Sequence, residues 1–453
     1  MASNKGHQNV TLTLLDRGAQ VDARGIKQDT PLHAASFSGH QNIALTLLDR
    51  GAQVDARNFK QCTPLHAASF SGHQNIALTL LDRGAQVDAR DDKQHTPLHI
   101  ASIKGHQNVA LTLLDRGAQV DSRAIKQDTP LHVASFSGHQ NIALTLLDRG
   151  AQVDARNFKQ CTPLHAASFS GHQNIALTLL DRGAQVDARD DKQHTPLHIA
   201  SIKGHQNVAL TLLDRGAQVD ARDDKQHTPL HVASQEGHRN VALTLLDRGA
   251  QVDARADKQH TPLHIASNKG HQNVALTLLD RGAQVDARNH LQQTPLHVAS
   301  ISGERDVTLT LLDRGAQVDA RDDYLRTPLH LAVHFGRQEV SLLLIDRGAS
   351  VEALDCLYRT PVDIASDEGN KNLAVLLADR ASAKDAKRSA NESSSQTADK
   401  LDDKNGSADA GESTQPAAQP STGQQGNQDV TFVQAGHDAT VKYLLDYMKK
   451  RKP

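Results

Sequence analysis

Aromatic residues are scarce in this chain. None of its 453 residues is a tryptophan, and Phe, Trp and Tyr together make up 3%. Because aromatic side chains bury large areas and dominate most cores, so small a share leaves little for one large central core. The length alone would suggest about three globular domains. The apolar residues are therefore expected to be buried in some other way than around a single core.

The net charge is also small, cysteine is rare and long apolar runs are lacking, and each of these features excludes a class of protein. The net charge is −2, so no overall field attracts nucleic acid or an anionic membrane. No apolar run approaches the roughly 18 residues of a membrane-spanning helix, and the first residues lack an apolar signal-peptide core. Of Cys62, Cys161 and Cys356, the first two are copies of one repeated position. A disulfide framework is therefore not expected, and a reducing compartment is favoured.

One motif, in contrast, is abundant. The tetrapeptide Thr-Pro-Leu-His occurs ten times at a constant spacing, without insertion or deletion, and begins at Thr30, Thr63, Thr96, Thr129, Thr162, Thr195, Thr228, Thr261, Thr294 and Thr327. An eleventh, altered copy reads Thr-Pro-Val-Asp from Thr360. A catalytic motif occurs once per site, whereas a motif at fixed spacing is usually architectural. The spacing therefore predicts a repeat protein.

A longer stretch has also been duplicated. Residues 25–123 recur at 124–222 with three differences, which are Gly25/Ala124, Ala34/Val133 and Ser122/Ala221. A block of three repeats has therefore been copied whole. Residues 2–10 also match 266–274, so the chain begins in the middle of a repeat.

Each repeat has the signals for two helices and a loop. Thr30 can cap a helix whose first position is Pro31, and Gly39 ends it. A second helix has an apolar side, and Gly51 is placed to end it; that apolar side consists of Ile43, Leu45, Leu47 and Leu48. One unit is too small to bury these four side chains, which contribute roughly 1.5–3 kcal/mol each only when covered. Stacking of neighbouring units would cover them.

Each period contains two helices and an extended loop, with Thr-Pro-Leu-His, Gly-His, Leu-Leu and Gly-Ala in that order. This pattern resembles the ankyrin repeat of roughly 33 residues. The resemblance covers residues 2 to about 381. It implies an all-α solenoid in which about ten full repeats, with a partial unit before and an altered unit after them, stack into an elongated, curved array. The family usually has Gly two residues before the Thr, at the hairpin tip, whereas this chain has Gln28 and its counterparts. Without Gly a positive φ is less accessible, which leaves the tip conformation open.

The repeated histidines are the first residues to consider for metal binding or catalysis. His33 and its counterparts in the tetrapeptide are expected to hydrogen-bond within the capping turn. His194, His227 and His260 precede the Thr in three consecutive repeats and should form a ladder along the loop edge, either as exposed polar side chains or as a site of metal binding or pH sensing. No glycine-rich phosphate loop and no spacing of nucleophile and base is present. We therefore expect no catalytic, cofactor-binding or metal site.

Variation between repeats indicates a binding surface instead. It is concentrated just before the Thr and at the seventh and eighth residues after it, positions that the resemblance assigns to the hairpin tips and the concave face. Apolar residues at these positions are Phe37, Phe70, Ile103, Phe136, Phe169 and Ile202 in the seventh place, and Phe59 and Phe158 in the hairpins. The resemblance implies that a row of exposed apolar side chains here binds a partner protein. Incidental apolar surface, or partial cover by the hairpins, is the alternative.

The repeat pattern ends after Arg380. We expect a solenoid at 1–381, a disordered low-complexity linker at 382–428, and a short amphipathic helix at 429–453 that resembles an ankyrin half-repeat. The final basic run, 449–452, is either a solvated helix end or a nuclear-import signal.

These features predict a protein–protein interaction scaffold or adaptor without catalysis. Its expected partners are one or more proteins rather than nucleic acid, and neither membrane insertion nor a cofactor is expected. The chain is expected to be monomeric and cytoplasmic, and nuclear if the basic run acts as an import signal. The alternative is a fragment or isoform of a larger multidomain ankyrin protein whose functional domain is absent.

Overall fold

The computed structural model describes residues 2–379 and 382. The chain divides into two units, Met1–Ser389 and Ala390–Pro453, and the described residues all belong to the first. Apart from Ser382, the predicted linker at 382–428 lies outside the described residues, as does the predicted helix at 429–453.

The described residues form pairs of short helices, and no β-strand occurs among them. The first helices of the pairs are α3 (Pro31–Ser38), α5 (Pro64–Ser71), α7 (Pro97–Lys104), α9 (Pro130–Ser137), α11 (Pro163–Ser170), α13 (Pro196–Lys203), α15 (Pro229–Glu236), α17 (Pro262–Lys269), α19 (Pro295–Ser302), α21 (Pro328–His334) and α23 (Pro361–Asp367). The second helices are α4 (Gln41–Asp49), α6 (Gln74–Asp82), α8 (Gln107–Asp115), α10 (Gln140–Asp148), α12 (Gln173–Asp181), α14 (Gln206–Asp214), α16 (Arg239–Asp247), α18 (Gln272–Asp280), α20 (Arg305–Asp313) and α22 (Gln338–Asp346), and residues 371–379 are also helical. A partial unit, α1 (Ala2–Lys5) and α2 (Gln8–Asp16), precedes them, and one loop contains the 3-10 helix η1 (Asp257–Gln259).

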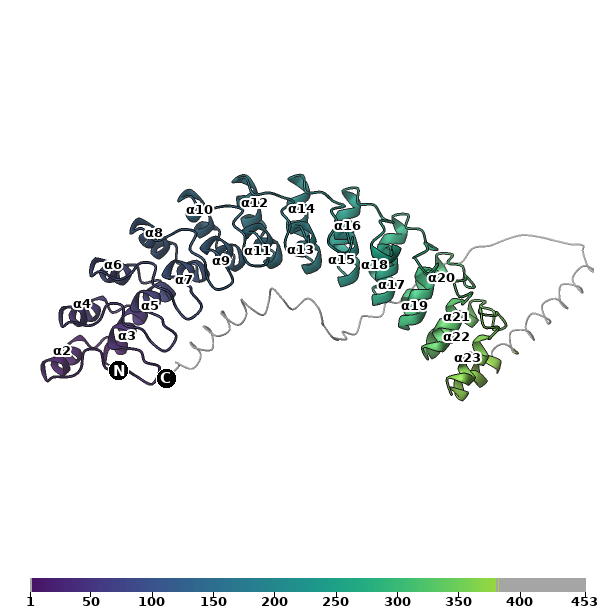
Figure 1. Ribbon diagram of the computed structural model, residues 1–453, viewed down its shortest axis with the longest axis horizontal. Coiled ribbons are helices and arrows are strands. Elements are labelled where there is room, and N and C mark those ends of the chain that lie inside the picture. Colours follow the sequence, from purple (N-terminus) through teal and green to yellow (C-terminus); the bar gives the residue numbers. More distant parts are fainter. Residues whose placement is uncertain (1, 380–381, 383–453) are drawn as a thin grey trace, which may run out of the picture. The chain divides into compact units, whose positions relative to one another are not determined.

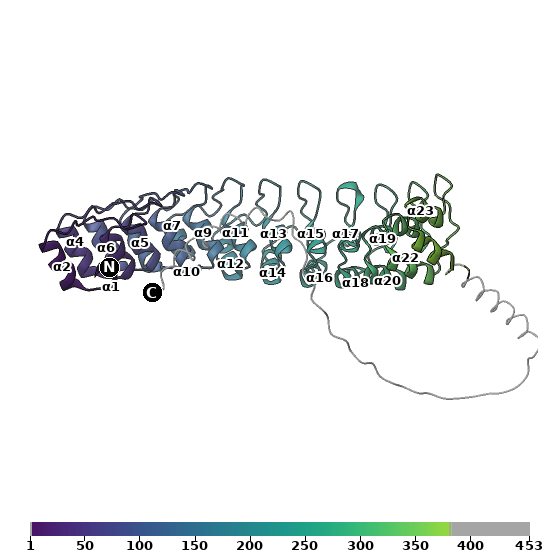
Figure 2. The same cartoon turned by 90° about the horizontal axis from the view of Figure 1, so that it is seen from below.

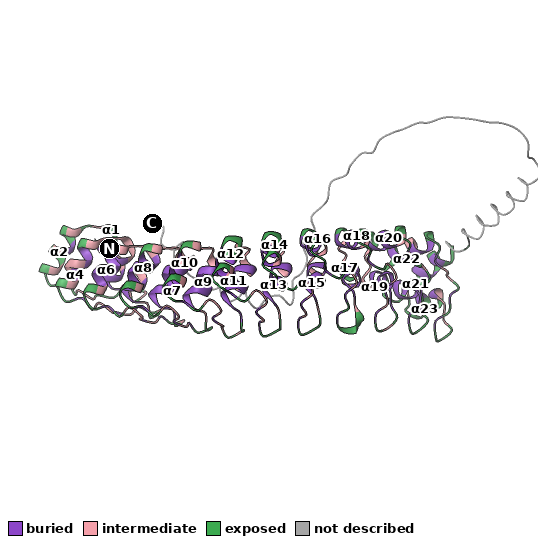
Figure 3. Cartoon of the chain, turned by 90° about the horizontal axis from the view of Figure 1, so that it is seen from above, coloured by how far each residue is buried: buried purple, intermediate pink, exposed green. Residues whose placement is uncertain are grey.

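Successive helix pairs lie side by side in a single row (Figure 1). Each first helix contacts the first helices of its neighbours, as α13 contacts α11 and α15, and the second helices do the same. Within this unit the row is curved, with the first helices on its inner side. The long loops project along one edge (Figure 2), and buried residues lie mainly in the helices (Figure 3). The predicted all-α solenoid is confirmed, and in the described part of the chain no helix is long and apolar enough to cross a membrane.

The tetrapeptide forms both the start of the first helix and a joint to the next repeat. In α13 the Oγ1 of Thr195 accepts the His198 N–H at 3.4 Å, and the Thr195 N–H donates to His198 Nδ1 at 3.2 Å. Nε2 of the same ring lies 3.1 Å from the carbonyl oxygen of His227 in the following repeat. A carbonyl only accepts, so Nε2 carries the proton. The predicted capping role of this histidine is confirmed, and the histidine also links two repeats.

The Gly-His pair forms a second joint. Gly204 ends α13 with φ +75°, and a Cβ there would lie 2.6 Å from Nδ1 of His238 in the next repeat. Nε2 of His238 lies 3.0 Å from the carbonyl oxygen of Ile202. Glycine is therefore needed here both for its left-handed backbone and for the space that the neighbouring ring occupies.

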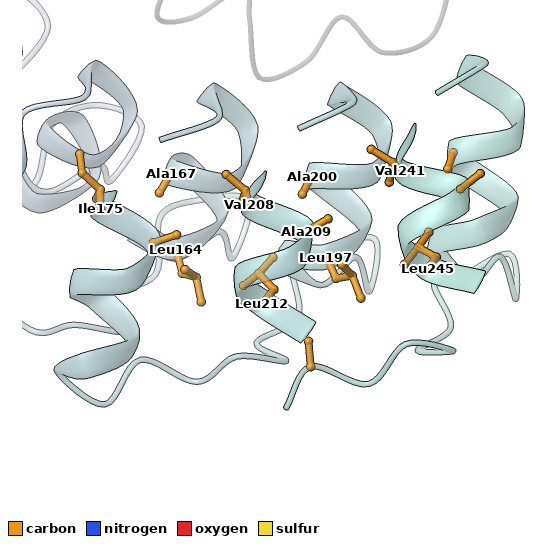
Figure 4. Close-up of a cluster of buried hydrophobic side chains, with 14 of the residues drawn as sticks. Leu164, Ala167, Ile175, Leu197, Ala200, Val208, Ala209, Leu212, Val241 and Leu245 are labelled. Atoms are coloured by element: carbon orange, nitrogen blue, oxygen red, sulfur yellow. The ribbon is translucent and has the colours of Figure 1, made fainter. Parts of the chain in front are cut away.

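The apolar core continues from one repeat into the next (Figure 4). Leu164 and Ala167 of one first helix, and Ile175 of its second helix, are at most 1% exposed, as are Leu197 and Val208 of the following repeat. Among the four predicted aliphatic positions, those of Ile43 and Leu47 are fully buried, whereas Leu45 and Leu48 are partly exposed. The small alanines between them let neighbouring helices approach closely.

Ion pairs connect the outer ends of the second helices. Each pair joins an aspartate to an arginine of the next repeat, with N–O distances of 2.5–2.8 Å. The pairs are Asp16–Arg50, Asp49–Arg83, Asp82–Arg116, Asp115–Arg149, Asp148–Arg182, Asp181–Arg215, Asp214–Arg248, Asp247–Arg281, Asp280–Arg314 and Asp313–Arg347. Since these side chains are solvent-accessible, each pair contributes only about 0.2–1 kcal/mol.

The glutamine at each hairpin tip adopts the left-handed conformation that glycine usually provides. Its φ lies between +57° and +61° at Gln28, Gln61, Gln127, Gln160, Gln193, Gln226, Gln259 and Gln292 and is +62° at Gln94, while Leu325 and Tyr358 follow with +57°. The tip therefore keeps its shape without glycine. A non-glycine residue in this region costs about 1–2 kcal/mol, so each tip carries local strain.

Replacing Gln226 by Gly should increase the free energy of unfolding by about 0.5–1 kcal/mol, because Gly adopts a positive φ without this penalty but has more entropy to lose. The side chain is exposed, and the tip hydrogen bonds, Gln226 N–H to Asp223 O and Arg222 to Gln226 O, use backbone atoms of Gln226 that Gly retains. Urea denaturation would measure the change. Gln218→Gly in the same loop is the control, because the φ of Gln218 is not positive, and it should destabilise. Equal destabilisation by both variants would show that the tip is not strained.

Candidate functional site

Two sets of side chains occupy the positions where the repeats differ. The inner row lies near the ends of the first helices and consists of Phe37, Phe70, Ile103, Phe136, Phe169 and Ile202. The tip aromatics, Phe59 and Phe158, lie in the hairpin loops. Because the members of the inner row recur at a fixed place in consecutive repeats, the stacking of repeats brings them next to one another along the array, whereas Phe59 and Phe158 are three repeats apart.

Rings of the inner row stack in pairs. The Phe37 and Phe70 ring centroids are 5.9 Å apart with an interplanar angle of 24°, and those of Phe136 and Phe169 are 5.8 Å apart at 24°. The next repeat adds a lysine, with Lys104 Nζ 4.3 Å from the centroid of Phe70 and Lys203 Nζ 4.4 Å from that of Phe169. Such ammonium–ring contacts are attractive, so each aromatic pair is covered by a cation.

The predicted row of exposed apolar side chains is wrong for part of this set. Phe70 is 8% exposed and Ile103 is 5% exposed. Phe37, Phe136, Phe169 and Ile202 are half-buried. For the phenylalanines, the physical reason is that a ring one repeat away stacks on each of them, and that Lys104 and Lys203 also lie over Phe70 and Phe169. These residues contribute to packing as well as to the surface, and their binding role stays a prediction.

The tip aromatics are exposed. Phe59 is 47% and Phe158 is 55% exposed, and the Nζ of the adjacent Lys60 or Lys159 lies 5.2 or 5.8 Å from the ring centroid. The backbone beneath them is fixed, because the Phe59 N–H donates to the Lys27 carbonyl of the preceding hairpin at 3.2 Å. Large apolar side chains on a fixed backbone lose little entropy when a partner covers them.

Two exposed isoleucines were missed by the sequence prediction. Ile26 is fully exposed and Ile125 is 61% exposed. Both occupy the place of Phe59 and Phe158, one residue before the lysine at the tip, so their shared position in the repeat could have revealed them. The apolar surface of the tips is therefore larger than the aromatic residues alone indicate.

Lysines follow these residues along the edge of the array. They recur at the same place in successive hairpins, as Lys27, Lys60, Lys93, Lys126, Lys159, Lys192, Lys225 and Lys258. Burial lowers the pKa of Lys93, and the positive charges of Lys60 and Lys126 lower it further. The negative charge of Asp92 raises the pKa of Lys93 and so partly offsets this lowering. The Asp92 carboxylate also lies 3.5 Å from Lys60 Nζ. Around Ile26, Phe59, Ile125 and Phe158 the edge thus combines apolar side chains with positive charge.

A chain of alternating aspartate and histidine crosses one junction between hairpins. His194 Nδ1 lies 3.3 Å from Asp190 Oδ2, and its Nε2 lies 3.6 Å from Asp223 Oδ2 in the next repeat. The same Asp223 oxygen lies 3.4 Å from Nδ1 of His227. Burial alone would lower the pKa of His194, but its interactions with the two carboxylates raise that pKa to about 9. Burial would likewise raise the pKa of Asp223, but the two histidines lower it.

The histidines of the tetrapeptide are engaged structurally, as His198 and His231 show. Burial lowers the pKa of His198 to about 4 and that of His231 to about 3, in agreement with rings whose Nδ1 accepts from the capping Thr. The predicted ladder is not uniform, because His260 packs against the ring of His290 at 6.2 Å and not against a carboxylate of the next hairpin. Among the described residues, no three histidine, cysteine or acidic side chains are placed to hold a metal ion.

Comparison with known proteins gives one consistent result. A family model described as ankyrin repeats (3 copies) matches residues 1–58, 56–124, 87–157, 123–190, 153–223, 187–256 and 253–322. A second, described as ankyrin repeats (many copies), matches residues 298–357. Among solved structures, a human protein titled "Crystal structure of human ASB11 ankyrin repeat domain" is similar, with 29% identity over 49% of this chain and 99% of that chain, and a TM-score of 0.46. No curated protein sequence matches the chain.

Phe70 and Phe59 should respond differently to substitution by serine. Phe70→Ser should lower the free energy of unfolding by about 2–4 kcal/mol, because the ring is buried and stacked and its loss leaves a cavity. Phe59→Ser is the matched control on the hairpin tip, and it should change the free energy of unfolding by less than about 0.5 kcal/mol. Urea denaturation monitored by circular dichroism would measure both. Equal effects of the two substitutions would contradict the burial difference.

His194→Gln should destabilise the array in a pH-dependent manner. The folded-state pKa of about 9 exceeds the ordinary 6.5, so protonation of His194 stabilises the fold fully below pH 6.5, and this stabilisation is lost as the pH rises through 9. The penalty should be on the order of 2 kcal/mol at low pH and shrink towards pH 9.

His95→Gln provides the control for that measurement. His95 lies in the first copy of the same hairpin, where Ala124 takes the place of Asp223 in the next repeat. Its substitution should cost less. Denaturation of both variants across this pH range would show the difference, and a penalty for His194→Gln that does not decline between pH 6.5 and pH 9 would disprove the charged pairing.

Proposed function

Because the chain belongs to the ankyrin-repeat family, we propose that it is a scaffold or adaptor that binds a partner protein along its hairpin tips and inner row. Ankyrin repeats are generally protein-interaction modules. The exposure of the tip aromatics Phe59 and Phe158 carries the finer proposal, since large apolar side chains held at the surface are typical of binding sites.

The arrangement of the repeats supports this role. The segments "GHQN" and "LTLLDRGAQVDAR", which contribute to the joints between repeats, are nearly unchanged along the chain. The array therefore supplies a regular support. Residues that differ between repeats are concentrated at the tips and the inner row, and at the exposed tips a change alters the surface. A partner that covers a ring such as Phe59 would bury apolar area at about 25 cal/mol per Å².

Catalysis is not part of the proposal. The histidines of the tetrapeptide and of the Gly-His pairs hydrogen-bond to the backbone, as His198 and His238 do. Carboxylates such as Asp55 accept backbone N–H groups, in this case that of Gln86. These recurring histidines and carboxylates therefore have structural partners, which favours a binding role over a reaction.

We place this function in a reducing compartment, the cytoplasm or the nucleus. Cys62, Cys161 and Cys356 are all free thiols. Burial raises the pKa of Cys62 and raises that of Cys161 to about 12, so neither thiol is activated. We also propose that the chain acts as a monomer.

Affinity capture tests the proposed function. The full chain and a Phe59→Ser/Phe158→Ser variant are used as baits, and mass spectrometry compares the captured proteins. We expect at least one protein to be reduced about tenfold or more with the variant, since loss of central anchors costs more than about 1.4 kcal/mol. Leu177→Ser is the control, because Leu177 is 37% exposed on the second helix α12. The proposal fails if every captured protein binds all three baits equally.

A further inference from the structure

The block duplication has produced two copies of the same surface. The first copy, residues 25–123, and the second, 124–222, differ at three positions, all occupied by residues with small or aliphatic side chains. None of the three is an aromatic residue or a lysine. The side chains that define the candidate binding surface are therefore the same in both copies.

The fold presents the two copies with matching geometry. The stacked rings of the inner row have nearly the same separation, at 5.9 and 5.8 Å, and the same interplanar angle of 24°. At the tips, the Phe59 and Phe158 N–H groups donate to the preceding lysine carbonyls at 3.2 and 3.1 Å. The amide groups of Asn58 and Asn157 each reach an aspartate of the previous hairpin at 2.8 Å.

Each copy exposes the same combination of chemical groups at its tips. The first has Ile26 and Phe59 beside Lys27 and Lys60, and the second has the equivalent apolar pair, Ile125 and Phe158, beside Lys126 and Lys159. The third hairpin of each copy has an Asp-Lys pair at the same place, and Asp92 approaches Lys60 at 3.5 Å. An apolar side chain flanked by carboxylates matches such a surface, because the carboxylates would face the lysines.

The surroundings of the copies differ on the inner row and at the hairpin that follows each copy, where Asp223 takes the place of Ala124. Ile103 is followed one repeat later by Phe136, whereas Ile202 is followed by Gln235. Burial lowers the pKa of Lys203, and Glu236 in the next repeat raises it, while Lys104 has Ser137 in that place. At the tips, Ile26 is more exposed than Ile125 because it belongs to the first hairpin. The aromatic tips are thus the best-matched part of the two copies.

We propose that the chain carries two equivalent binding sites for one acidic, apolar peptide segment, one site on the tips of each copy. Its partner would present that segment twice, in tandem or in a homodimer. This inference rests on the proposed function and specifies its stoichiometry. Surfaces with the same side chains on closely matching backbone contacts should bind the same ligand with similar affinity.

The spacing of the copies limits which partners can bridge them. The sites are three repeats apart, or about 25–30 Å at roughly 8–10 Å per helix layer. An extended linker covers at most about 3.3–3.6 Å per residue, so two segments on one partner need at least roughly eight residues between them. Bridging then raises affinity through effective concentration, by about 100-fold or more.

The test begins with short random peptides displayed on phage and selected on the full chain. The Phe59→Ser/Phe158→Ser variant serves for counter-selection. We expect enriched peptides with net negative charge and at least one large apolar residue. Isothermal titration calorimetry with the synthetic consensus peptide should give two equivalent sites on the wild type and one on either single variant. The double variant should show at least a tenfold loss of affinity.

Several outcomes would overturn the inference. A stoichiometry of one on the wild type would show a single site, and so would loss of all binding in only one of the two single variants. Failure to enrich any peptide, or enrichment of basic peptides, would disprove the proposed ligand chemistry. A tandem peptide with a linker well above the minimum should bind more tightly than one with a linker below it, and equal affinity would show that the two sites are not bridged.

The outcome also separates this inference from the proposed function. If a protein captured by the wild type is lost with the double variant but the consensus peptide binds once, the scaffold role stands and the two-site inference fails. If neither a protein nor a peptide depends on Phe59 and Phe158, both fail.

Discussion

The structure depends on one histidine per repeat, which serves two units at once. Through Nδ1 the ring completes the cap of its own first helix, and through Nε2 it holds a carbonyl of the following hairpin, as His198 does with Thr195 and His227. Because one nitrogen must accept and the other must donate, the ring has to be neutral. The start of the helix and the joint to the next repeat therefore share the same side chain, so stability belongs to neighbouring pairs of repeats.

Most of the fold could be predicted from the sequence because its signals lie within one period. Thr195, Pro196 and Gly204 define a helix by local rules of capping and backbone conformation, and the fixed spacing requires every unit to repeat the result. Variation between repeats also marks the positions of the proposed binding residues. For Phe59 and Phe158 the predicted exposure agrees with the structure.

The remainder depends on contacts between repeats, which a single unit does not encode. Phe70 is covered because Phe37 and Lys104 arrive from the repeats on either side. The pKa of His194 is raised because Asp190 and, from the next hairpin, Asp223 face it. The local sequence of one repeat does not encode the second of these, since Ala124 takes the place of Asp223 after the first copy. The left-handed tips could not be predicted for a different reason. Local preference disfavours a positive φ for glutamine, but the hairpin geometry imposes one.

The uniform joints have a consequence for how the gene can change. An arginine meets an aspartate from the previous unit, and a histidine meets a carbonyl of the next, at nearly every boundary. If recombination removes or inserts a whole number of repeats, the new boundary brings together the same residue types as the old one. Alleles of different length could therefore fold without compensating mutations. Boundaries with a special pair, such as the one between His194 and Asp223, are the places where such a change would not be neutral.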